Sequence, residues 1–255
     1  MSILQAKIRN GVLVLLTVLV VSGCSTAPIL EGSEPEEPFF PAERILSPDI
    51  NYAAQINDPW EGFNRRVYNF NYKFDKYIFL PAVHVYQLIT PDFVETGIHN
   101  FMNNYRSITT LINSILQLSP SKTVDTTGRF VVNTTIGLLG FLDPATAMGI
   151  PAHQEDMGQT LGYWGVGSGP FLMLPILGPS SVRDGIGTGV DWFVLTEIRD
   201  AVVELETWQW MLWGTLDALD TRAHIGFRYY ETGSPFEYEL VRWLWTTKRK
   251  IDIAK

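Results

Sequence analysis

The sequence has a single cysteine, Cys24, among 255 residues, so no disulfide can form within the chain. Its four histidines include no pair at metal-ligand spacing and no His-Glu-x-x-His motif. Ser168 lies among glycines, but Val166 and Pro170 occupy the positions where a nucleophile elbow requires glycine. No lysine follows these glycines as in a phosphate-binding P-loop. The sequence therefore predicts no enzyme, no metal site and no cofactor site.

Positive charge is also scarce, because 19 Lys and Arg face 27 Asp and Glu, giving a formal net charge of -8. The basic footprint of a nucleic-acid-binding protein is absent. Lys248-Arg249-Lys250 favours a solvated helix end over a contact with anionic headgroups. Charged residues make up 18% of the chain, against about 25% in typical domains, whereas 13% of the residues are aromatic. This composition suits a surface that is partly covered by lipid or another protein.

Long hydrophobic runs are missing beyond the amino-terminal segment. The stretch 130–142 has 13 residues, too few to cross a bilayer as a helix. The 26 residues of 157–182 carry no formal charge, yet six glycines and three prolines interrupt them. We therefore expect a domain that lies in or against one leaflet, or inside a ring of other protein, without single-helix crossings.

The segment 1–23 has the pattern of an export signal, with Lys7 and Arg9 before a short apolar stretch. Val21-Ser22-Gly23-Cys24 resembles the lipobox of bacterial lipoproteins. That resemblance implies a diacylglycerol on the Cys24 thiol, cleavage before Cys24 and acylation of the new amino terminus. The residue after Cys24 is Ser25 and not an aspartate, and this resembles the sorting pattern of lipoproteins that go to the outer membrane. The alternative is an ordinary signal peptide followed by a chance free thiol.

The composition of 24–50 is typical of a disordered tether, since prolines and glutamates dominate and Arg44 is its single positive side chain. The remaining residues, 51–255, form one domain by length and contain no internal repeat. We expect a signal peptide over 1–23, a lipidated tether over 24–50 and a folded domain over 51–255.

Helical periodicity dominates this domain, and the alternating runs of hairpin strands are missing. Asp58-Pro59-Trp60-Glu61 predicts a helix start capped by Asp58, and apolar residues from Trp60 to Ile78 then share one helix face. Ser181 and Ser234 each precede an acidic residue by three positions, which predicts two further capped starts. We expect an all-α fold with further helices over about 92–104, 107–118, 121–136, 181–194, 197–221 and 235–250.

A glycine-rich segment interrupts the uncharged aromatic stretch. Because glycine permits positive φ and close backbone approach, we expect a sharp turn here, at an edge that faces a membrane or a pore. The candidate loop or hinge residues are Gly162, Tyr163, Trp164, Gly165, Gly167, Gly169 and Pro170.

Motifs in collinear order over about 55–195 carry a family resemblance. They are Asn57-Asp58-Pro59-Trp60-Glu61-Gly62-Phe63-Asn64-Arg65, Tyr68-Asn69-Phe70-Asn71, 129–137, 140–145, 158–171, Leu174-Pro175, Gly178-Pro179-Ser180 and Arg183-Asp184. Together with the lipobox, they resemble the MlaA family, also called VacJ-like lipoproteins. The resemblance implies a compact helical ring in the inner leaflet of the outer membrane, bound to a trimeric porin. It further implies a passive phospholipid conduit that removes misplaced phospholipids from the outer leaflet and passes them to a periplasmic carrier, MlaC.

A polar ribbon borders the apolar face of the first domain helix. Asn64, Tyr68, Asn71 and Asp75 fall within about 60° of one another on a helical wheel. Their amides, phenol and carboxylate could hydrate a passing headgroup, so they are candidates for the lipid path. The alternative is an ordinary solvent-exposed helix edge.

Two other functions compete with lipid conduction. A structural lipoprotein would clamp a porin and leave lipid traffic to other proteins, and it predicts no continuous polar stripe along a central opening. An envelope enzyme, such as a lipase or a cell-wall hydrolase, needs an acid, base or nucleophile set that the sequence does not assemble.

Overall fold

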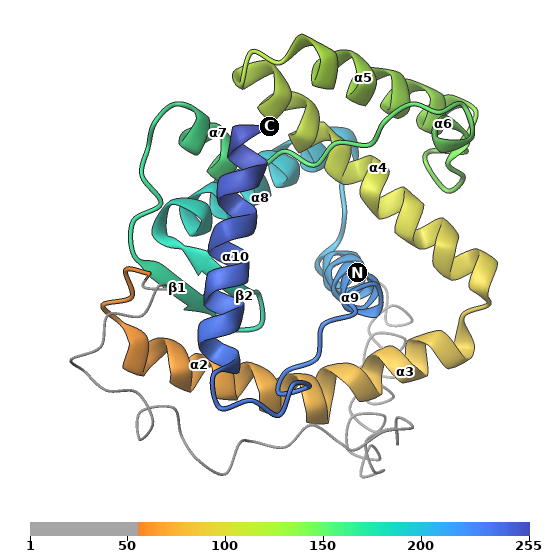
Figure 1. Ribbon diagram of the computed structural model, residues 1–255. Helices are drawn as coiled ribbons and strands as arrows, with labels where there is room; N and C mark the ends of the chain where they lie inside the picture. Colours follow the sequence, from red (N-terminus) through yellow and green to blue (C-terminus); the bar gives the residue numbers. More distant parts are fainter. Residues whose placement is uncertain (1–55) are drawn as a thin grey trace.

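The computed structural model of the protein describes residues 56–255, and the lipobox, the tether and residues 51–55 lie outside this range. The described chain is mostly helical, as the sequence predicts. Its helices are arranged as a ring (Figure 1). One side holds α2 (Glu61–Phe74) and α3 (Leu80–Ile89), the next holds α4 (Asp92–Leu116), and the remaining sides hold α7 (Met157–Tyr163), α8 (Val182–Val202) and α10 (Glu237–Ala254). Helix α9 (Thr207–Ala223) is seen end-on within this frame (Figure 1).

The first side of the ring is one long rod made of α2 (Glu61–Phe74), η2 (Asp75–Phe79) and α3 (Leu80–Ile89). The π-helical turn η2 ends two residues before Pro81, whose missing N–H and bulky ring disturb the carbonyl one turn earlier. A wider turn accommodates that proline without breaking the rod. The rod ends at Thr90, which is extended because Pro91 follows it.

The predicted cap of this rod is wrong. The residue before α2 is Trp60, and no side chain caps the helix. The Asp58 carboxylate instead accepts hydrogen bonds from Asn64 (2.7 Å), Tyr238 (2.5 Å) and Arg242 (2.8 Å). Asp58 therefore joins the start of α2 to the C-terminal helix α10, where its charge is neutralised by Arg242.

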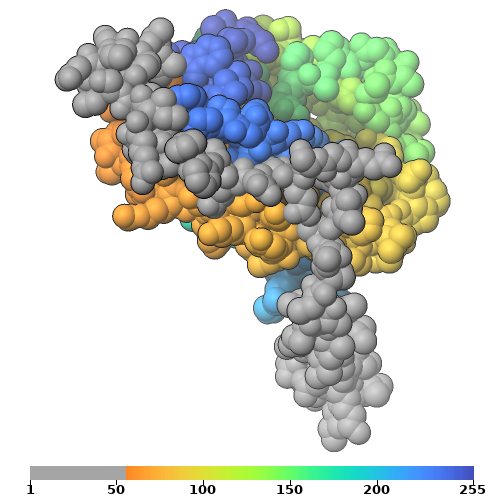
Figure 2. All heavy atoms as spheres, turned by 60° about the horizontal axis from the view of Figure 1, so that its bottom comes forward, coloured from red at the N-terminus to blue at the C-terminus, as the bar shows by residue number. Residues whose placement is uncertain are grey.

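Next along the chain come α4 (Asp92–Leu116), α5 (Pro120–Thr135), α6 (Pro144–Ala147) and α7 (Met157–Tyr163). Helix α4 replaces the two shorter helices predicted over 92–118, since neither proline nor glycine interrupts residues 98–118. Helix α5 packs along the outer side of α4, and α6 packs against α5 (Figure 1). In the space-filling view, α2, α3 and α4 succeed one another along one side of the molecule (Figure 2).

A short β-hairpin follows, which the sequence did not predict. Strands β1 (Phe171–Leu174) and β2 (Gly178–Ser181) pair antiparallel, with Phe171 opposite Ser181 and Leu174 opposite Gly178. Each strand has four residues, too few for an alternating pattern to stand out in the sequence.

The last helices are α8 (Val182–Val202), α9 (Thr207–Ala223) and α10 (Glu237–Ala254). Ser181 caps α8 as predicted, because its hydroxyl accepts a hydrogen bond from the Asp184 N–H. The helix predicted over 197–221 is confirmed only in its later part, α9, because residues 197–202 belong to α8 and the chain leaves the helical conformation before Thr207. Ser234 does not cap α10 either, and the helix begins after Phe236.

A small aromatic core lies between α2, the hairpin and α10. Its buried members are Val67, Tyr68, Tyr72, Phe171, Met173, Tyr230 and Tyr238. Tyr68 lies at its centre and makes edge-to-face contacts with the rings of Tyr229, Tyr230 and Tyr238.

Candidate functional site

The distribution of side chains between interior and surface is the main functional feature of residues 56–255. The buried residues comprise eleven hydrophobic and 23 polar or charged ones. At the surface, Leu88, Ile89, Phe93, Leu118 and Val202 are each at least 70% exposed. No helix in the described range is both long and apolar enough to cross a bilayer. So much exposed apolar surface is typical of a protein that contacts lipid or another protein.

The two faces of α2 show most clearly that apolar side chains lie outside and polar side chains lie inside. Phe63 and Phe70 on the apolar face are 52% and 48% exposed. Asn64, Tyr68 and Asn71 of the polar ribbon are between 0% and 2% exposed, and Asp75 is 5% exposed. The four ribbon residues do lie together, but they point into the protein. The alternative of a solvent-exposed helix edge is therefore wrong.

Two asparagines of the ribbon bind the backbone of the hairpin. Asn64 donates to the Phe171 carbonyl (3.2 Å) and accepts from the Met173 N–H (2.9 Å). Asn71 donates to the Leu174 carbonyl (3.0 Å) and accepts from the Ile176 N–H (2.7 Å). Each amide thus satisfies a donor and an acceptor that would otherwise be left without a partner, as a neighbouring strand would. These contacts fix β1 on the inner face of α2.

Tyr68 connects the same helix face to the start of α10. Its hydroxyl donates to the Glu237 carboxylate at 2.6 Å, and Glu237 also accepts from the Thr232 N–H and hydroxyl. Burial, followed by the hydrogen bond to Glu237, raises the pKa of Tyr68 above that of an ordinary tyrosine. The phenol therefore stays protonated and holds the buried carboxylate.

Asp75 anchors the far end of α9. Arg222 binds both carboxylate oxygens of Asp75, at 2.6 and 2.8 Å, and both side chains are buried. The remaining Arg222 donors reach the carbonyls of Ile225 and Phe227. This bidentate pair ties α9 and the chain that follows it to the rod.

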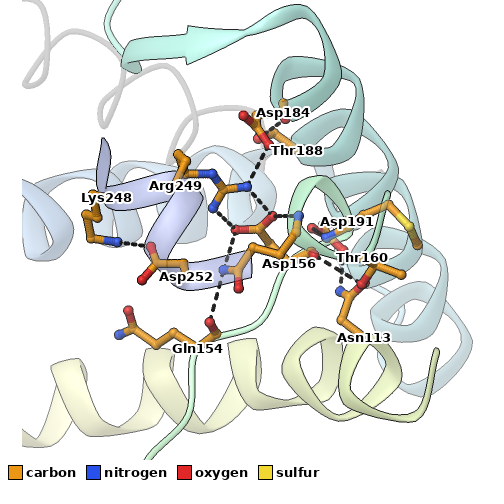
Figure 3. A network of polar contacts seen from close by, with 12 residues as sticks. Asn113, Gln154, Asp156, Thr160, Asp184, Thr188, Asp191, Lys248, Arg249 and Asp252 are labelled. Atoms are coloured by element: carbon orange, nitrogen blue, oxygen red, sulfur yellow. Dashed lines mark hydrogen bonds and ion pairs between the residues drawn. The ribbon is translucent and has the colours of Figure 1, made fainter. Parts of the chain in front are cut away.

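A second charged network joins α7, α8 and α10 (Figure 3). Arg249 of α10 contacts both oxygens of Asp156, at 2.7 and 2.8 Å, and Asp184 of α8 at 2.7 Å. The Asp184 carboxylate also accepts a hydrogen bond from the Arg183 guanidinium. The prediction of a solvated helix end at 248–250 is wrong for Arg249, whose side chain is 12% exposed.

Arg249 lowers the pKa of one carboxylate in this network, that of Asp156. Burial acts to raise the pKa of Asp156, but the hydrogen bonds and charge of Arg249 outweigh it and lower that pKa below the ordinary aspartate value. At Asp191, burial prevails over hydrogen bonds from Met157 and Asn113, so its pKa is raised. The partner, and not depth of burial alone, therefore sets the direction of each pKa shift.

The glycine loop turns as the sequence predicts. Gly165 and Gly169 have φ angles of +87° and +68°. Tyr163 and Trp164 are 50% and 60% exposed, and the Trp164 indole donates to the Leu116 carbonyl at 3.0 Å. Its exposed aromatic rings suit a membrane interface, which stays a prediction.

The other members of that predicted segment have different roles. Gly162 lies inside α7, where an added Cβ would come within 2.6 Å of Ile253. Gly167 is exposed and nothing lies within 4 Å of its Cβ position. The Pro170 carbonyl accepts from the Val182 N–H at the start of α8. The segment is therefore part helix, part open loop and part hairpin edge.

Comparisons with known proteins agree with this architecture. A family model described as MlaA lipoprotein matches residues 56–252. The intermembrane phospholipid transport system lipoprotein MlaA of Escherichia coli (strain K12) is 35% identical over 176 residues, which cover 66% of this chain and 67% of that protein. Its namesake from Haemophilus influenzae is 32% identical over 167 residues, or 64% of this chain and 63% of that protein.

Other relatives match a shorter stretch. An uncharacterized Rickettsia prowazekii protein is 38% identical over 134 residues, and this chain spans about half the length (53%) of that relative. A solved structure, described as the structural basis for maintenance of bacterial outer membrane lipid asymmetry, superposes with a TM-score of 0.61 at 26% identity. That match covers 78% of this chain and all (100%) of the other. Because the family model covers most of the chain, the protein belongs to the MlaA lipoprotein family.

Proposed function

We propose that this protein is a lipid-anchored outer-membrane component of a system that moves phospholipids between the membranes of a bacterial envelope. It removes misplaced phospholipids from the outer leaflet and passes them to a periplasmic carrier, MlaC. The observation that carries the proposal is the inverted distribution of side chains, apolar outside and charged inside, in a ring of the MlaA family.

The physical chemistry of phospholipids explains why this distribution suits the task. Transfer of an acyl chain from hydrocarbon into water costs about 0.8 kcal/mol per methylene, and transfer of a charged headgroup into hydrocarbon is also unfavourable. An apolar exterior lets the ring sit in the inner leaflet, and polar groups inside it can accommodate a headgroup. Lipid that moves down its own gradient needs no nucleotide, so the component acts passively. A trimeric porin holds the ring in place, and acylated Cys24 tethers it to the membrane.

The polar ribbon remains a candidate for the lipid path, with a constraint from the geometry. Asn64, Tyr68, Asn71 and Asp75 already have partners inside the protein. A headgroup could use them only by competing with the hairpin, Glu237 or Arg222. Their support of the ring wall is the simpler role, and the two roles differ in what substitution does to stability.

The proposal can be tested in a strain that lacks the gene. Parent protein should restore lipid asymmetry, measured as low accessibility of outer-leaflet phospholipid to an added phospholipase. Cys24→Ser should leave an unacylated protein that fails to restore it. If this variant still floats with outer membranes and restores asymmetry like the parent, lipid anchoring at Cys24 has no part in the function.

Extraction in mild detergent separates conduction from a structural role. A conduit should co-purify with phospholipid in stoichiometric amount as well as with a porin. A lipoprotein that only clamps a porin should bring down the porin without stoichiometric phospholipid, and that result would overturn lipid conduction.

A further inference from the structure

Three potential metal ligands meet where α9 approaches α4. His99 lies on α4, Asp220 lies in the last turn of α9, and His224 directly follows that helix. His99 Nδ1 is 2.9 Å from Asp220 Oδ2, and His224 Nδ1 is 3.5 Å from Asp220 Oδ1. The two imidazole rings stack with their centroids 3.6 Å apart. One ligand atom from each residue lies within 4.8 Å of the other two.

The buried carboxylate at the centre of this cluster is incompletely satisfied. Asp220 is 0% exposed, and its Oδ1 has no hydrogen-bond partner among residues 56–255. The nearby hydroxyl of Tyr86 is buried and also lacks a partner in that range. Burial, with added repulsion from Asp220, raises the pKa of Tyr86 to about 12, so this neighbour contributes no negative charge. A buried anionic oxygen without a donor is costly unless a cation completes its environment.

Neighbouring charges do not supply that cation. Asp217, one turn earlier on α9, pairs with Arg106 and leaves no cation for Asp220. Arg106 otherwise bonds Asn103 and Thr221, and no ion pair between it and Asp220 is found in the described chain. The groups that directly face the Asp220 carboxylate are the two histidines, which are 28% and 36% exposed and thus reachable from solvent.

We propose that His99, Asp220 and His224 bind a zinc ion, with water in the fourth position. Two imidazole nitrogens and one carboxylate are a ligand set that zinc accepts in tetrahedral geometry, at about 2.0–2.2 Å from each ligand. Ligand atoms in such a site are about 3.4 Å apart. To bind the same ion as His99, the His224 ring must turn out of its stack on His99, and its Nδ1 gives up the 2.9 Å contact with the Asp220 main-chain carbonyl. The His224 side chain is 36% exposed, which leaves it free to turn.

The surroundings of His99 fit this role. Zinc on Nδ1 leaves the single imidazole proton on Nε2, which lies 2.9 Å from the Asn103 side-chain amide. The amide accepts this proton once its oxygen turns toward His99, away from its 3.3 Å contact with Arg106, and it then orients the ring as outer partners of zinc-bound histidines commonly do. The third ligand, Asp220, supplies a carboxylate oxygen from the last turn of α9.

Zinc at this position would join α4 to the end of α9. Asp75 and Arg222 hold the same end of α9 to the rod, and Arg106 of α4 already binds Asp217 and Thr221 of α9, so the metal would strengthen an existing contact between α4 and α9. The inference does not depend on lipid transport, since binding is a property of the purified protein.

The test is a zinc titration of the full-length, detergent-solubilised protein after treatment with a chelator. Calorimetry should give one zinc per chain and a higher melting temperature, and H99Q/H224Q should weaken binding at least about 10-fold. H153Q is the matched control, because His153 also pairs with an aspartate, Asp125 at 3.0 Å, but has no second histidine beside it. Its affinity should equal that of the parent.

Cobalt provides a readout that needs no variant. Co²⁺ bound to the chelator-treated parent should give the visible absorption of a tetrahedral site, and zinc should displace it. Parent-like zinc affinity in H99Q/H224Q, or an equal loss in H153Q, would place the metal elsewhere. Absence of both zinc binding and the cobalt spectrum in the parent would overturn the proposal outright.

Discussion

The outer and inner faces of α2 are built from opposite kinds of residue, and in the reverse order to a water-soluble helix. Phe63 and Phe70 lie outside, about half exposed, whereas Asn64 and Asn71 lie inside with every amide group bonded to the hairpin. The inner face is held by directional contacts that fail when one partner is removed. The outer face has few such contacts and depends on what surrounds the protein. The same residue change should therefore have very different effects on the two faces.

The difference in stability between changing a buried and an exposed side chain should be largest at two adjacent basic residues of α10. Arg249→Met leaves Asp156 and Asp184 without their shared partner and should lower the free energy of unfolding by about 3 kcal/mol. Lys248→Met removes only a surface pair with Asp252, since Lys248 is 70% exposed, and should change it by less than about 0.5 kcal/mol. Chemical unfolding in mild detergent measures both. Similar losses in the two variants would contradict a buried network around Arg249.

The inner face of α2 gives the next largest effect. Asn64→Leu with Asn71→Leu leaves two hairpin N–H groups and two carbonyls without partners, and should cost about 2 kcal/mol or more. Arg66→Leu, on the exposed side of the same helix, should stay within about 0.5 kcal/mol of the parent. If the double variant keeps parental stability yet loses lipid asymmetry in cells, these asparagines belong to the lipid path and not to the ring wall.

Two glycines of the exposed loop test whether the backbone conformation or the space around the side chain determines the cost of a substitution. Gly165→Ala forces a side chain onto a residue with φ of +87° and should cost about 1 kcal/mol. Gly167→Ala adds a methyl group in open space and should be nearly neutral. Thermal unfolding of the two variants tests the difference, and equal midpoints would mean that the loop relaxes freely around Gly165.

The smallest change in stability is expected on the outer face of α2. Phe63→Ser with Phe70→Ser should alter unfolding in detergent by less than about 1 kcal/mol, because about half of each ring contacts the surroundings and the main contact within the protein is the stack of Phe70 on Phe74. The variant should bind less detergent per protein molecule, which light scattering coupled to size-exclusion chromatography measures. A large loss of stability with unchanged bound detergent would show that this face packs on the protein itself.

Local sequence was sufficient for features that depend on neighbouring residues. The helical periodicity, the Ser181 cap and the positive φ of Gly165 and Gly169 follow from short-range sterics and hydrogen bonding. The two faces of α2 could also be predicted, because the helical repeat alone separates apolar from polar positions. The export signal and Cys24 are equally local patterns, and their role remains a prediction.

Only the tertiary structure decided which face of α2 points inward, because periodicity is symmetric with respect to inside and outside. It alone placed Arg249 between Asp156 and Asp184, and Asp58 beside Arg242, since each pairing joins segments far apart in the chain. The same reason explains why no histidine pair could be recognised in the sequence. His99 and His224 come together only because α9 returns to α4, and chain folding, not spacing, sets the distance between them.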